Sequence, residues 1–69
     1  MEQRDVERIA RGVLVDLGAP FSLVSVERTG TGWRVVLSSA SNRRLIALLP
    51  GGPASAVRAT LRQRVESED

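Results

Sequence analysis

The sequence has 69 residues, of which 26% are charged, and its formal net charge is +2. A chain of this length forms one domain, 1–69, with a small core, because it buries only about 60% of its unfolded surface. It contains no cysteine and no histidine, which excludes disulfides and zinc sites built from these residues.

The charges are segregated along the chain. Residues 28–65 contain seven arginines and no acidic residue, whereas five acids lie in residues 1–27 and three in residues 66–69. Such patterning indicates an anionic partner.

Residues 3–17 are predicted to form an amphipathic helix. Apolar residues recur at the spacing typical of one helix face: Val6, Ile9, Ala10, Val13, Leu14 and Leu17. Gly18 suits a C-terminal cap, and Pro20 follows it. Glu2 and Asp5 favour the positive end of the helix dipole.

Three strands are predicted next, over residues 21–28, 33–39 and 43–49. Residues 29–32 have the length and composition of a hairpin turn. In the second strand, Trp33, Val35 and Leu37 share one face, while Arg34, Val36 and Ser38 lie on the other. The third strand is apolar on both faces from Leu45 onward.

A second helix is predicted over residues 53–66, after the break at residues 50–53. Pro53 suits its first turn, and its apolar stripe comprises Ala54, Val57, Leu61 and Val65. The acidic C-terminal end opposes the helix dipole, so we expect fraying over residues 66–69. We also expect residues 1–2 to fray.

The order α-β-β-β-α predicts a small α+β domain, with two helices on one face of a three-stranded antiparallel meander. The other sheet face then carries Val36 and one apolar row of the third strand. That row is either Ile46 and Leu48 or Leu45, Ala47 and Leu49. We take Val36, Ile46 and Leu48 as interface candidates for a homodimer or a larger partner. The alternative is that the second helix and the turns cover this face.

The chain offers no candidate catalytic residue, metal ligand or cofactor site. Histidine, cysteine, lysine and tyrosine are all absent, and the serines have no base to activate them. The carboxylates do not follow the spacing of a calcium loop. We therefore expect no enzymatic activity.

Anion binding is the chemistry that the sequence favours. Arginine forks contact phosphates in bidentate geometry, and the candidates are Arg34, Arg43, Arg44, Arg58 and Arg62. A solvated basic surface is the alternative. The turn containing Gly51, Gly52 and Ser55 enters a helix and is a weaker anion-binding candidate.

The element order resembles that of the double-stranded-RNA-binding domain and of the small HicA-type RNase toxins. The motif residues of both families are missing here. Residues 53–56 replace the lysine-rich start of the second helix of the RNA-binding domain, and the catalytic histidine of the toxin is absent. The resemblance therefore transfers no functional residue.

The sequence predicts a non-enzymatic module that contacts an anionic partner, foremost the nucleic-acid backbone. The alternative is a protein–protein module, such as an adaptor, an inhibitor or a small assembly subunit, whose partner has an acidic surface or is a second copy of the chain. A cytoplasmic location is expected, because the N-terminus lacks the apolar core of a signal peptide. No apolar run approaches the roughly 20 residues of a membrane span.

Overall fold

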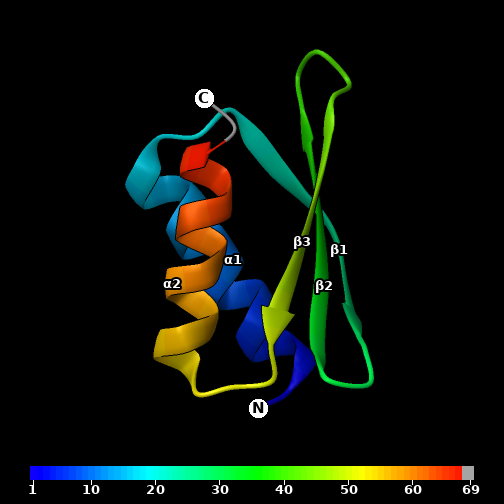
Figure 1. Ribbon diagram of the computed structural model, residues 1–69. Helices are drawn as coiled ribbons and strands as arrows, with labels where there is room; N and C mark the ends of the chain where they lie inside the picture. Colours follow the sequence, from blue (N-terminus) through cyan, green and yellow to red (C-terminus); the bar gives the residue numbers. More distant parts are fainter. Residues whose placement is uncertain (68–69) are drawn as a thin grey trace.

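The computed structural model describes residues 1–67 and shows two helices packed on one face of a three-stranded sheet (Figure 1). Its elements are α1 (Gln3–Leu17), β1 (Phe21–Arg28), β2 (Gly32–Ser39), β3 (Arg44–Pro50) and α2 (Ala54–Ser67). The strands are antiparallel and lie in the order β1-β2-β3. The predicted α-β-β-β-α meander is confirmed.

Helix α1 has the predicted bounds, and both of its ends are fixed by hydrogen bonds. At its start, the backbone N–H of Glu2 donates to a carboxylate oxygen of Asp5 at 2.9 Å. At its end, Gly18 takes the left-handed conformation (φ +60°) that ends many helices. The following Ala19 N–H donates to the carbonyl of Leu14 at 3.1 Å.

The two strand pairs differ in regularity. β2 and β3 stay in register from Gly32 opposite Pro50 to Ser38 opposite Arg44. Between β1 and β2, the register shifts between Leu23 and Ser25. This irregularity is a bulge, which adds one residue to β1 and bends the strand locally.

The second half of the chain differs from the prediction by one residue at several boundaries. β2 begins at Gly32, because this residue pairs with Pro50, which is the last residue of β3 and not part of the break. Arg43 precedes β3, and its carbonyl accepts the Ser39 N–H at 2.9 Å in the connecting turn.

Helix α2 begins one residue later than predicted and extends one residue further. Pro53 lies before the helix, and its carbonyl accepts the N–H groups of Ala56 and Val57. At the other end, the Ser67 hydroxyl donates to the carbonyl of Gln63 at 2.7 Å. Fraying was predicted for residues 66–69. Glu66 and Ser67 belong to the helix, and residues 68–69 lie outside the described part of the chain.

The core lies between the two helices and the inner face of the sheet. α1 packs against β1, α2 packs against β3, and the helices contact each other. The buried side chains include those predicted for α1 and the Trp33, Val35 and Leu37 row of β2. Because both helices lie on this one face, the other face of the sheet remains open.

Candidate functional site: the outer face of the sheet

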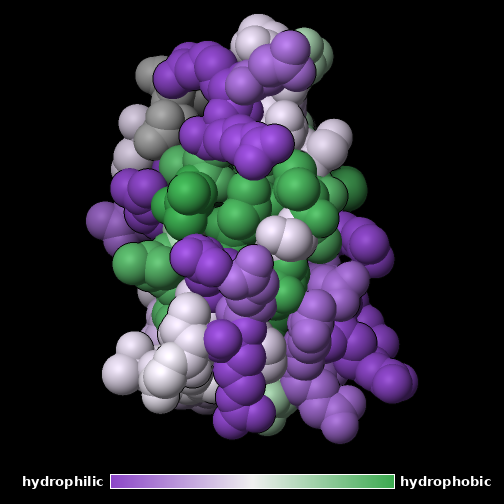
Figure 2. All heavy atoms as spheres, turned by 90° about the vertical axis from the view of Figure 1, so that its right-hand side faces the viewer, coloured by the Kyte–Doolittle hydropathy of each residue, from purple (hydrophilic) through white to green (hydrophobic). Residues whose placement is uncertain are grey.

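An apolar patch covers the middle of the outer face of the sheet (Figure 2). Three of its side chains are well exposed: Val24 and Ile46 at 51% and Leu48 at 68%. Val36 lies opposite Ile46 in the register and is half-buried. We call Val24, Val36, Ile46 and Leu48 the apolar patch. An exposed cluster of this kind commonly marks an interaction site.

The alternation of β3 decides which of its two apolar rows faces outward. Leu45, Ala47 and Leu49 point inward and are at most 5% exposed, so the intervening Ile46 and Leu48 lie outside. The prediction left this choice open. Neither α2 nor the described turns cover the row.

Val24 belongs to the patch although the sequence analysis did not select it. It lies at the β1 bulge, next to Leu23, which packs against the core. The adjacent pair Leu23 and Val24 was the available signal, because neighbouring apolar residues on a strand occupy opposite faces.

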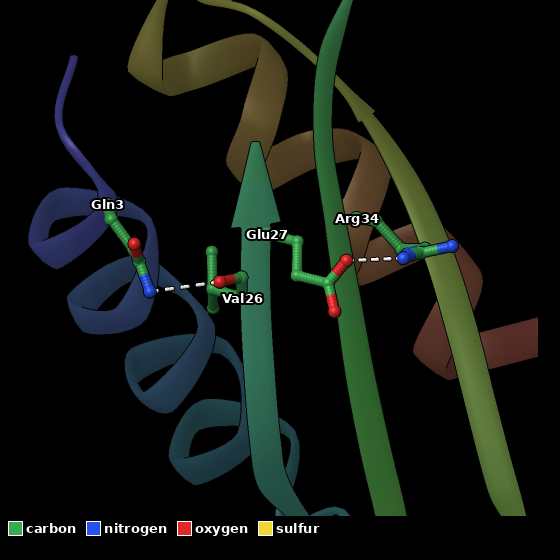
Figure 3. A network of polar contacts seen from close by, with 4 residues as sticks. All are labelled: Gln3, Val26, Glu27 and Arg34. Carbon is green, nitrogen blue, oxygen red and sulfur yellow. Dashed lines mark hydrogen bonds and ion pairs between the residues drawn. The ribbon is translucent and has the colours of Figure 1, made fainter. Parts of the chain in front are cut away.

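One end of the patch is bordered by an ion pair across β1 and β2 (Figure 3). Glu27 and Arg34 are direct partners in the strand register, and the guanidinium of Arg34 donates to the Glu27 carboxylate. Directly opposed opposite charges stabilise a strand pair modestly. The pair neutralises the acidic group at this end of the face.

Two further arginines border the patch on the β3 side. Arg44 begins β3 on the outer face, opposite Ser38. Arg64 extends from α2, and its guanidinium donates to the backbone carbonyl of Ile46 at 3.1 Å. Within residues 1–67, no acidic side chain forms an ion pair with Arg44 or Arg64. The border of the patch therefore carries three arginines and one glutamate.

One side chain from each helix donates a hydrogen bond to a backbone carbonyl at an edge of the sheet. In an antiparallel ladder, residue pairs that share backbone hydrogen bonds alternate with pairs that do not. The Ser39 N–H donates to the Arg43 carbonyl, so these two residues form a bonded pair. Ile46, three residues after Arg43, belongs to a pair of the other kind, and its N–H and carbonyl therefore point away from β2, to the outer edge of β3. The guanidinium of Arg64 donates a hydrogen bond to the Ile46 carbonyl there. On β1, the side-chain amide of Gln3 donates to the carbonyl of Val26 at 2.9 Å (Figure 3).

The five arginines predicted to contact phosphate do not form one surface. Arg34 and Arg44 lie on the outer face of the sheet, and Arg43 lies in the turn before β3. Arg58 and Arg62 lie on α2, which covers the opposite face of the sheet. Arg62 also pairs with Glu66 at 3.2 Å. The structure thus divides these arginines between its two layers.

The glycine-rich turn before α2 has a conformational reason for one of its two glycines. Gly52 adopts φ +154°, a value that side-chain-bearing residues rarely take. At Gly51, by contrast, a Cβ would make only an ordinary contact, 3.5 Å from the carbonyl oxygen of Thr31. Ser55 and Arg58 line an open hollow of about 410 Å³ on the surface of α2.

Among residues 1–67, no group of three or more acidic, histidine or cysteine side chains could hold a metal ion. No helix there is long and apolar enough to cross a membrane.

Comparison with protein-family models, with curated proteins and with solved structures gave no match.

Proposed function

We propose that this protein is a non-enzymatic interaction module, such as an adaptor, an inhibitor or a small assembly subunit, which docks on a partner protein through the apolar patch. The exposure of Val24, Ile46 and Leu48 on one open sheet face carries this proposal. Fully burying one such side chain stabilises by about 1.5–3 kcal/mol. Because these side chains are already partly buried, covering each would contribute a fraction of this amount, and the cost of association reduces the sum.

Binding of the nucleic-acid backbone has weaker support in the geometry. Arg58 and Arg62 lie on the helix layer, so they cannot act on one duplex surface together with Arg34 and Arg44 on the outer sheet face. Arg34 and Arg62 already pair with carboxylates. The arginines around the patch instead favour a protein partner with acidic groups around an apolar centre.

A cytoplasmic location is part of the same proposal. The absence of cysteine supports it, because proteins of reducing compartments do not depend on disulfides.

The test compares tagged full-length protein with Ile46→Asp and Leu48→Asp variants in cells of its source. The matched control is Val15→Asp, because Val15 is 78% exposed but lies on α1. A partner identified by mass spectrometry is then reconstituted with purified wild type and variants. We expect both patch variants to lose the complex and the control to retain it, with unchanged circular dichroism for all three.

Salt and nuclease treatment distinguish the two functions. A complex held by the apolar patch persists at high salt, whereas phosphate contacts weaken steeply. Retention of the purified complex by Ile46→Asp and Leu48→Asp would refute the proposal. Loss of capture after nuclease treatment would instead support nucleic-acid binding.

A further inference from the structure

We infer that the group docking on the apolar patch is an amphipathic helix of the partner, whose apolar stripe is flanked by acidic residues. This inference rests on the proposed function and specifies the partner.

The sheet edges disfavour an added strand as the occupant. Strand addition uses the outward backbone groups of an edge strand. On β3, the Ile46 carbonyl already accepts from Arg64 at 3.1 Å, and Pro50 at the end of the strand has no N–H to donate. On β1, the Val26 carbonyl accepts from Gln3, and a bulge follows Leu23. Docking is therefore directed to the face of the sheet.

The width of the patch matches one helix. Its members come from all three strands, with Val24 on β1, Val36 on β2, and Ile46 and Leu48 on β3. Neighbouring strands lie about 4.8 Å apart, so the patch is about 10 Å across, which is the diameter of a helix with its side chains. A helix laid there would add a third layer to the fold, as in other layered domains.

The charges around the patch specify acidic flanks on that helix. Arg44 lies at one end of the patch and Arg64 at the β3 edge, and neither forms an ion pair within residues 1–67. Arg64 uses one guanidinium N–H for the Ile46 carbonyl and keeps other donors available. Glu27 is already held by Arg34. Acidic side chains beside the apolar stripe would meet these arginines.

A second copy of the chain fits this face less well. Two copies would bring six arginines and two glutamates around the joined patches, and like charges oppose association.

The experiment is a display selection with helical peptides of about 18 residues, which span the roughly 25 Å length of the strands. Selection uses the full-length wild-type protein, with counter-selection against Ile46→Asp. We expect the enriched peptides to carry Leu or Ile at helical spacing and Asp or Glu along the side of this stripe that faces β3. Their affinity should fall about tenfold for the double variant Arg44→Glu/Arg64→Glu. Arg58→Glu on the other layer is the matched control.

The outcomes separate this inference from the proposed function. Enriched peptides without acidic flanks, or equal binding by Arg44→Glu/Arg64→Glu and wild type, would overturn the charge assignment. Enriched peptides that bind as extended strands, or a selection that enriches nothing, would overturn the helix. Either result leaves the function intact if Ile46→Asp still disrupts the native complex. Light scattering that shows a dimer of wild type and a monomer of Ile46→Asp would assign the face to a second copy.

Discussion

The guanidinium of Arg64 on α2 donates a 3.1 Å hydrogen bond to the backbone carbonyl of Ile46 on β3, 18 residues away in sequence. The side chain of Ile46 lies in the apolar patch, while its carbonyl points to the edge of the sheet. Ile46 therefore belongs to two surfaces: its carbonyl lies at the edge of β3 that Arg64 blocks, and its side chain lies on the open face of the sheet. Exposed edge strands invite uncontrolled pairing between chains, and natural proteins commonly block them.

We predict that Arg64→Ala increases self-association of the protein. The change removes one exposed hydrogen bond, so stability should fall by less than about 1.5 kcal/mol, while β3 regains an outward acceptor. Light scattering over a concentration series should give a higher average mass than for wild type. Arg58→Ala removes an arginine from the same helix without touching β3, and it should leave the mass unchanged. Equal masses for all three proteins would show that Arg64 does not protect the edge.

The same substitution should affect stability strongly on the inner face of β3 and hardly at all on its outer face. Leu45 is 4% exposed and packs in the core, whereas Leu48 is 68% exposed. Leu45→Ala should lower the free energy of unfolding by about 2–5 kcal/mol. This is a large part of the roughly 3–10 kcal/mol expected for a chain of this size. Leu48→Ala should change it by less than about 0.5 kcal/mol.

Urea unfolding followed by circular dichroism measures both changes. A large loss for Leu48→Ala would mean that this side chain is buried in solution, for instance against a second copy. The assignment of the open face would then be wrong.

The sequence was sufficient to predict the elements, because the periodicities are clear. The helix spacing of Val6, Ile9 and Val13 and the strand alternation around Val35 each have one interpretation. The outward row of β3 was undecided, since both of its rows are apolar. Only pairing with β2 shows that Ile46 faces outward.

The grouping of the arginines could not be predicted from the sequence. Arg44 and Arg58 are both exposed and both lie in the acid-free segment, but they belong to different layers. The contact between Arg64 and β3 depends on how α2 packs, for which the spacing of its apolar residues gives no signal. Charge patterning along a chain therefore overstates charge clustering in space.

Helix α1 should become more stable when Gly12 is replaced by alanine. Gly12 lies within the helix, and a Cβ there would meet no atom within 4 Å. Glycine inside a helix costs about 0.5–1 kcal/mol relative to alanine, so Gly12→Ala should raise the melting temperature. Gly18→Ala is the contrasting change, because its Cβ also has open space but φ is +60°. It should lower stability by about 1–2 kcal/mol. Stabilisation by both changes would contradict the left-handed cap.

Gly32 should tolerate no side chain, because β3 passes directly over it. A Cβ at this position would lie 1.9 Å from the carbonyl oxygen of Leu49, which is too close for any real contact. Gly32→Ala must therefore displace the end of β3, where Gly32 pairs with Pro50. We expect destabilisation of at least about 1–3 kcal/mol, as for other overpacked sites.

The matched control is Gly30→Ala in the preceding turn, where a Cβ would meet nothing within 4 Å. Its stability should stay within about 0.5 kcal/mol of wild type. Backbone amide shifts measured by NMR should move at Leu48, Leu49 and Gly51 for Gly32→Ala and remain local for Gly30→Ala. Small, local shifts for both variants would show that Gly32 and Leu49 do not approach each other in this way. The register that places Ile46 and Leu48 on the outer face would then lose support, because the same strand pair sets both.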